Sequence, residues 1–165
     1  FYNRNNIIYG FDTFYGYTEE DLVESESKFD TRLMEGYLDN QNKKRFVVDE
    51  SSIKTRMKNL GFDNITKIIK GDIKETTKNF VPKSGKISML YVDCNIYGAS
   101  KAGINNLKKY FSDGCLVVAD CGFCTTPDPL VGEHEALYEY KVESGNVLYR
   151  TYFGDYVAFF VEVKK

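Results

Sequence analysis

The sequence lacks the features that mark membrane and secreted proteins. No apolar run approaches the roughly 18 residues needed to cross a bilayer, and the N-terminus does not have the charged, apolar and small-residue order of a signal peptide. The net charge is only -2, with Lys and Arg dispersed among Asp and Glu rather than gathered in a basic stripe. We therefore expect a cytoplasmic protein without a membrane or nucleic-acid partner.

Internal repeats, low-complexity tracts and linkers are also lacking, so we expect one domain over residues 1–165. The cysteines do not suggest a disulfide framework, because all fall in one third of the chain: Cys94, Cys115, Cys121 and Cys124. Cys121 and Cys124 have the spacing of a zinc or redox half-site. A zinc site needs further ligands, and His134 is the only histidine. We expect structural, reduced thiols.

Two apolar runs each end in an aspartate. Residues 87–92 lead to Asp93, and residues 115–119 lead to Asp120. Such runs indicate strands buried on both faces of a parallel sheet, where ligands gather at the carboxyl ends of the strands. The pair is a candidate metal or substrate site. The alternative is that each aspartate caps the helix or turn that follows it.

The pattern along the chain predicts alternating strands and helices. Strands are expected over 7–14, 65–69, 87–92, 116–119, 147–153 and 156–163, the last two flanking a Gly-Asp turn. Helices are expected from Ser51 or Ser52 to Gly61, over 75–80, over 100–110 with residues 112–114 ending it, and over 131–144. This predicts an α/β, Rossmann-like, mostly parallel sheet with helices on both faces and a C-terminal antiparallel hairpin.

Four blocks occur in an order typical of one enzyme family. They are YGFDTFYG (9–16), KGDIKET (70–76), YVDCNIYGASK (91–101) and DGCLVVADCGF (113–123). Together they resemble the macrocin O-methyltransferase family of class I S-adenosylmethionine (SAM)-dependent enzymes. The likeness runs from about residue 7 to the C-terminus.

The resemblance implies SAM as the cofactor. In the family, the acidic end of the second strand meets the SAM ribose, and the third strand end lies beside the adenine. We therefore predict these cofactor-binding residues: Asp12, Thr13, Phe14, Gly71, Asp72, Ile73 and Asp93. A carboxylate such as Asp12 pairs well with a ribose diol. The alternative roles are a turn residue for Asp12 and a helix cap for Asp72.

Two positions depart from the family pattern. The family has a third metal ligand directly after the residue matching Asp120, where this chain has Cys121, and a catalytic base where this chain has Asn95. A thiol is a poor Mg²⁺ ligand, and an amide cannot accept a proton at neutral pH. Asp93 and Asp120 therefore remain as the predicted ligands of a weak Mg²⁺ site.

Catalysis then depends on Asn95, which we predict to orient the acceptor, and on a replacement base. His134 and Asp128 are the candidates, and an imidazole has a suitable ordinary pKa of ~6.5. The alternative for His134 is an exposed residue on a helix.

One element of the family is missing from the sequence. The resemblance places a first strand and a Gly-rich SAM-binding turn between the strands at 7–14 and 87–92, and residues 1–6 cannot supply them. Without this strand, the strands at 7–14 and 87–92 would each have an unpaired apolar edge, and such edges promote aggregation. We therefore expect the native chain to be longer at its N-terminus, another segment to fill this place, or the strand order to differ from the one predicted.

The resemblance implies a SAM-dependent O-methyltransferase acting on a small hydroxylated molecule, such as a sugar or a secondary metabolite. The second hypothesis is a noncatalytic relative that serves as a binding or assembly module, favoured by Asn95 and Cys121. A third is a nucleotide-sugar or NAD-binding enzyme, because a strand-end aspartate also meets ribose there. A homo-oligomer is left open.

Overall fold

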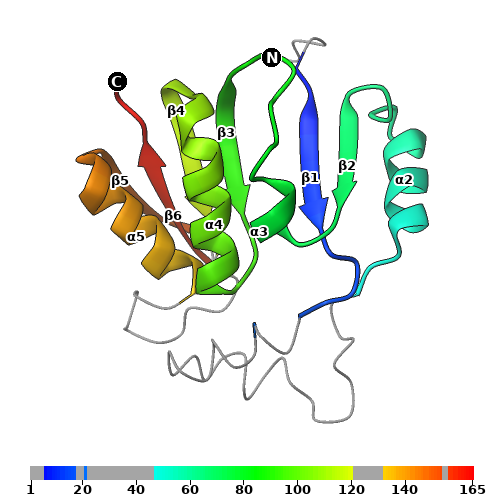
Figure 1. Cartoon of the computed structure of the whole chain (residues 1–165), viewed down its shortest axis with the longest axis horizontal. Helices are drawn as coiled ribbons and strands as arrows, with labels where there is room; N and C mark the ends of the chain where they lie inside the picture. Colours follow the sequence, from blue (N-terminus) through cyan, green and yellow to red (C-terminus); the bar gives the residue numbers. More distant parts are fainter. Residues whose placement is uncertain (1–5, 18–20, 22–46, 121–131, 154–155) are drawn as a thin grey trace.

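The computed structural model describes residues 6–17, 21, 47–120, 132–153 and 156–165. Its elements are β1 (Ile8–Asp12), α2 (Glu50–Asn59), β2 (Thr66–Lys70), α3 (Ile73–Thr76), β3 (Ile87–Val92), α4 (Tyr97–Leu107), the 3-10 helix η2 (Lys108–Tyr110), β4 (Phe111–Ala119), α5 (Glu133–Ser144), β5 (Val147–Phe153) and β6 (Tyr156–Glu162). Strands alternate with helices until two strands close the chain (Figure 1). The predicted α/β class is confirmed.

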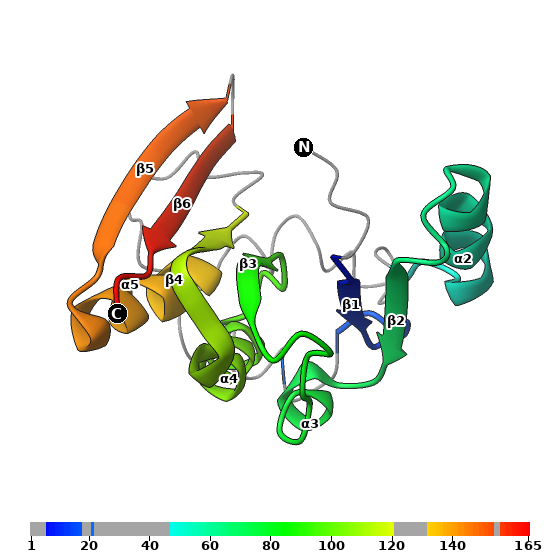
Figure 2. The same cartoon turned by 90° about the horizontal axis from the view of Figure 1, so that it is seen from above.

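The larger sheet has the strand order β3-β4-β6-β5. β3 and β4 are parallel, and their last residues, Val92 and Ala119, lie opposite each other. β6 runs antiparallel to both β4 and β5, as predicted for the C-terminal hairpin. Seen from above, α3, α4 and α5 lie on one side of the strands (Figure 2).

A second, smaller sheet consists of β1 and β2, which are parallel and place Asp12 opposite Lys70. Within the described ranges, no ladder joins β1 to β3. The interruption falls between the two strands that flank the missing family strand in the sequence analysis. β1 and β3, the strands on either side of this interruption, each belong to a parallel pair, and they run in the same direction in Figure 1.

Side chains connect the two sheets where backbone pairing does not. Phe80, which precedes β3, packs edge-to-face against Tyr9 and Phe11 of β1, with ring centroids 4.8 and 5.1 Å apart. Ile73 of α3 lies so close to Gly103 of α4 that a Cβ there would be 3.0 Å from Ile73 Cδ1. A glycine at this position therefore allows α3 to approach α4 closely.

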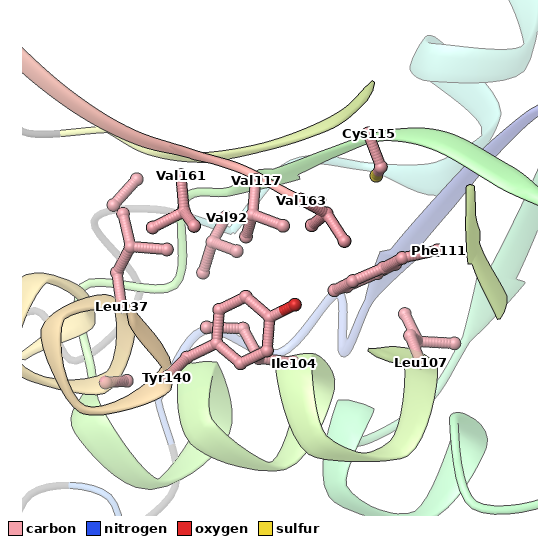
Figure 3. Packing of buried hydrophobic residues seen from close by; sticks show 12 residues of the cluster. Val92, Ile104, Leu107, Phe111, Cys115, Val117, Leu137, Tyr140, Val161 and Val163 are labelled. Carbon is pink, nitrogen blue, oxygen red and sulfur yellow. The ribbon is translucent and has the colours of Figure 1, made fainter. Parts of the chain in front are cut away.

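The core lies between the larger sheet and the helices α4 and α5 (Figure 3). Its buried members are Val92, Ile104, Leu107, Phe111, Cys115, Val117, Ala119, Ala136, Leu137, Tyr140, Val161 and Val163. Phe111 and Tyr140 meet edge-to-face at 5.9 Å. Full burial of one large apolar side chain contributes about 1.5–3 kcal/mol, so this side of the fold has the larger stabilising core.

Several predicted boundaries were wrong. Asp49, not Ser51 or Ser52, caps α2, because its carboxylate accepts a hydrogen bond from Ser52 N at 2.9 Å. Residues 112–114 do not end a helix before the strand; they lie inside β4. Gly114 adopts φ +73°, and its N–H still donates to the carbonyl of Val163 at 2.8 Å, so the strand continues through a glycine that resembles a turn residue.

Helix length bears on the membrane prediction. Among the helices of the described ranges, none has the length and apolar character needed to cross a membrane.

Candidate active site

The candidate site residues lie where the parallel strands end. β1, β2 and β3 point to the same end of the molecule (Figure 1), and β4 is parallel to β3. Asp12, Gly71, Asp93 and Asp120 occupy or directly follow these strand ends. Such edges are where open α/β sheets bind their ligands.

Asp12 organises the turn after β1. One carboxylate oxygen, Oδ1, accepts a hydrogen bond from Phe14 N at 2.6 Å, so the alternative role as a turn residue is present in the structure. Phe14 adopts φ +58°, which is uncommon for an aromatic residue. Asp12 is an exposed residue, and the hydrogen bond from Phe14 N engages only Oδ1. Thr13 closes the same turn by donating to Gly16 O at 3.0 Å.

The predicted adenine-side residues lie next to this turn. Gly71 N donates to the carbonyl of Asp12 at 2.9 Å, joining the ends of β1 and β2. Asp72 is the N-cap of α3, and its Oδ1 accepts from Lys74 N at 2.7 Å, so the helix-cap role is present. Ile73 is half-buried and packs toward Ile96 and Ala99.

Lys70 is a residue of this edge that sequence reasoning missed. Its ammonium lies 5.8 Å from the ring centre of Phe14 and 5.2 Å from that of Tyr15. Both distances suit cation–π attraction. The signal in the sequence was the placement of a lysine at the strand end, directly before Gly71.

The two predicted metal ligands belong to adjacent strand ends. Asp120 N donates to the carbonyl of Val92 at 2.9 Å, which places Asp120 beside the strand that leads to Asp93. The pKa of Asp93 is raised above its ordinary value, first by partial desolvation and then by the negative charge of Asp120. Asp93 is nevertheless exposed on its outer side. The pair is thus electrostatically coupled.

Tyr91 joins this pair and was also missed from the sequence. It lies on β3, is 53% exposed, and its hydroxyl is hydrogen-bonded to the Asp120 carboxylate. Desolvation, followed by this hydrogen bond and the surrounding carboxylates, raises the pKa of Tyr91. The phenol therefore stays protonated and available as a hydrogen-bond donor.

Asn95 links the end of β3 to the segment that follows β1. Its backbone has φ +58°, a left-handed conformation that asparagine adopts more readily than most residues. Its Nδ2 donates to Tyr17 Oη at 3.1 Å, across from the turn after β1. The carboxylate of Glu133, in the first turn of α5, accepts from the backbone N–H groups of Cys94 at 3.1 Å and Asn95 at 2.9 Å.

His134 differs from its expected environment. Its side chain is only 3% exposed, so the alternative of an exposed helix residue was wrong. His134 lies in the first turn of α5. This helix packs Ala136, Leu137 and Tyr140 into the core, and the packing accounts for the burial of His134. Cys94 and Cys115 are free thiols, as expected.

The remaining sequence predictions lie outside the described residues. These are the roles of Cys121, Cys124 and Asp128. Within the described residues, no group of at least three His, Cys, Asp or Glu side chains could hold a metal ion. Asp93 and Asp120 alone supply two hard ligands, so the structure offers no support for a resident Mg²⁺.

Comparison with solved structures identifies the architecture. The O-methyltransferase NovP matches with a TM-score of 0.74 and 18% identity over 99% of this chain and 62% of that protein. The chain has a class I methyltransferase fold. CalS11, a calicheamicin methyltransferase, matches with a TM-score of 0.68 and 21% identity over 98% of this chain and 62% of that protein. The chain thus spans less than two thirds of the length of either structure.

This methyltransferase fold does not determine the methyl acceptor. An rRNA methylase from Streptococcus thermophilus also matches, with a TM-score of 0.52 and 11% identity over 96% of this chain and 74% of that protein. At such identities the likeness establishes architecture only. No family model matches the sequence, and no curated protein matches it.

Proposed function

We propose that the protein is a SAM-dependent O-methyltransferase that acts on a small hydroxylated acceptor, such as a sugar or a secondary metabolite. The observation that carries this proposal is the hydrogen bond between Tyr17 and Asn95. It joins the Asp12 turn to the end of β3, where Asp93 lies beside Asp120 at the end of β4. A methyl donor and an acceptor must meet in such a place, because transfer requires close alignment of two bound molecules.

The residues of the Asp12 turn fit the sugar of SAM. One Asp12 oxygen holds the turn, while the exposed carboxylate can accept a hydrogen bond from a ribose hydroxyl. Asp72 is committed through Oδ1 to capping α3, and Ile73 provides apolar surface toward an adenine. Bound SAM supplies a methyl group on a positively charged sulfur. The nearby carboxylates of Asp93 and Asp120 complement such a charge.

Proton removal from the acceptor is assigned to Asp93 in this proposal. Asn95 uses Nδ2 as a donor to Tyr17 and therefore orients neighbouring groups without taking a proton. His134 is only 3% exposed, which separates its imidazole from bulk solvent. Asp93 is exposed, and its raised pKa makes it a stronger proton acceptor than an ordinary aspartate.

A noncatalytic binding module is the second candidate. It is favoured by Asn95, which replaces a proton-accepting carboxylate, and by the absence of a three-ligand metal group from the described residues. Such a module would bind SAM or a small acceptor and leave both unchanged.

Calorimetry and transfer assays test the proposal together. SAM should bind the protein, whereas NAD at the same concentration should not. Binding of NAD would instead indicate a nucleotide-sugar or NAD-binding enzyme. Labelled methyl transfer is then measured to neutral sugar hydroxyls and to carboxylate acceptors. Binding of SAM with transfer supports the enzyme, and binding of SAM without transfer supports the module. Absence of SAM binding contradicts the enzyme and leaves only a module that binds the acceptor.

A further inference from the structure

Glu133 occupies a small anion-binding cradle at the end of β3. Its side chain is 3% exposed, and its Oε2 accepts the consecutive backbone N–H groups of Cys94 and Asn95 at 3.1 and 2.9 Å. Consecutive N–H groups in a turn that includes a left-handed residue form a concavity that binds anions. Here the anion comes from α5, more than thirty residues further along the chain.

The conformation that forms this cradle also directs the Asn95 side chain. A left-handed backbone costs a side-chain-bearing residue energy unless nearby contacts support it. At Asn95, with φ +58°, the contact is the hydrogen bond to Glu133. The same turn aims Nδ2 of Asn95 at Tyr17 Oη, 3.1 Å away. Removing the carboxylate would therefore release the link between the two sides of the site.

The negative charge of Glu133 also acts on neighbouring side chains. Burial raises the pKa of the Cys94 thiol to about 12, with the Glu133 charge as the next cause. The charge also contributes to the raised pKa of Tyr91, after desolvation, Asp120 and Asp93. Glu133 thus contributes both a fixed geometry and a fixed charge at the end of β3.

We propose that Glu133 is a positioning residue, an internal carboxylate that fills the cradle after β3 and holds Asn95 against Tyr17. The role extends beyond methyl transfer, because it concerns the geometry of the site whatever the acceptor. Glu133 acts through Asn95 and needs no contact with a substrate.

Two substitutions separate geometry from charge. Glu133→Ala empties the cradle, while Glu133→Gln keeps a side-chain oxygen that can accept both N–H bonds. Glu143→Gln is the matched control, because it removes a charge from the exposed last turn of the same helix. The readouts are the amide proton shifts of residues 94 and 95 and the Asn95 Cα shift, which reports left-handed backbone.

Glu133→Ala should move both amide signals and change the Asn95 Cα shift. Added formate, a carboxylate small enough for the vacated space, should return them toward wild-type values. Glu133→Gln should keep the Cα shift and move only the amide protons upfield, since a neutral acceptor makes weaker hydrogen bonds. Unchanged amide signals in both variants, or an effect of Glu143→Gln equal to that of Glu133→Gln, would overturn the proposal.

Alkylation of Cys94, followed by peptide mass spectrometry, provides a second measurement. Glu133→Ala should speed alkylation because the Cys94 N–H loses its partner and the turn that holds the thiol loosens, whereas Glu133→Gln and Glu143→Gln should leave the rate near that of the wild type. If Glu133→Ala does not fold, the Gln amide shifts still decide the question. None of these readouts requires SAM binding, so failure of the proposed function would appear separately.

Discussion

Asp12→Asn tests the ribose assignment with little disturbance to the fold. The Asn oxygen can keep the hydrogen bond from Phe14 N, which is 2.6 Å long in the structure. The contact between Gly71 N and the Asp12 carbonyl belongs to the backbone and is retained. What changes is the second oxygen, which becomes an N–H₂ donor and can no longer accept from a ribose hydroxyl. Asp12→Ala removes both interactions.

The structure limits the expected size of the effect. Because one oxygen is committed to Phe14, a single charged hydrogen bond to ribose is at stake. Such a bond contributes about 1.5–3 kcal/mol, so Asp12→Asn should raise the dissociation constant for SAM roughly 10- to 150-fold. Asp12→Ala should bind more weakly still, since Phe14 also loses support for its φ of +58°.

Calorimetric titration with SAM measures these constants directly. Asp63→Asn is the matched control, because Asp63 is exposed and precedes β2 at the end of the sheet opposite Asp12. Asp63→Asn should bind SAM as the wild type does. Equal SAM affinity in the wild type and Asp12→Asn would refute the ribose assignment.

Three further predictions concern Asn95, Cys121 and Asp93. Asn95→Asp should raise methyl transfer to a neutral hydroxyl, because it adds a second carboxylate base beside Asp93, and should slow transfer to an anionic acceptor by repulsion; rates unchanged from the wild type with both acceptors would place Asn95 outside the reacting centre. Cys121→Asp should strengthen Mg²⁺ binding measured by calorimetry, whereas tight binding by the unmodified protein would show that the metal site was misplaced. The pKa of Asp93 is higher in the folded protein than in the unfolded chain. The free energy of unfolding that Asp93 contributes is therefore fully present below the ordinary aspartate pKa, and it is lost as the pH rises through the folded-state pKa. Urea unfolding at a series of acidic pH values should therefore show a smaller loss of stability with rising pH in Asp93→Asn than in the wild type, and identical profiles would contradict the raised pKa of Asp93.

Local sequence patterns predicted the strand ends well. The apolar run at 87–92 became β3 with the predicted bounds, because a continuous apolar run with a polar end leaves few other structures. The Gly-Asp pair between residues 147–153 and 156–163 correctly predicted an antiparallel hairpin. The resemblance also placed Asp12 and Asp72 at adjacent strand ends, which Gly71 joins in the structure.

Contacts between distant residues could not be predicted in the same way. Glu133 and Asn95 lie 38 positions apart, and Tyr17 and Asn95 lie 78 apart. No local pattern distinguishes Glu133 from a solvated acid in a first helical turn. Its burial follows from the packing of α5 against the core. The extension of β4 through Gly114 likewise depends on pairing with Val163, which offsets the turn preference of a Ser-Asp-Gly sequence.

The interruption between β1 and β3 has a consequence for how the molecule opens. Hydrogen-bonded ladders unfold cooperatively, but the smaller sheet joins the larger one through side chains such as Phe80 and Ile73. Regions with few shared backbone bonds often form separate units of local unfolding. We therefore expect native-state hydrogen exchange to release the amides of β1 and β2 together, at a lower free energy than those of β3, β4 and β6. The larger sheet would then stay folded while the smaller sheet, with Asp12 and Lys70 at its end, opens.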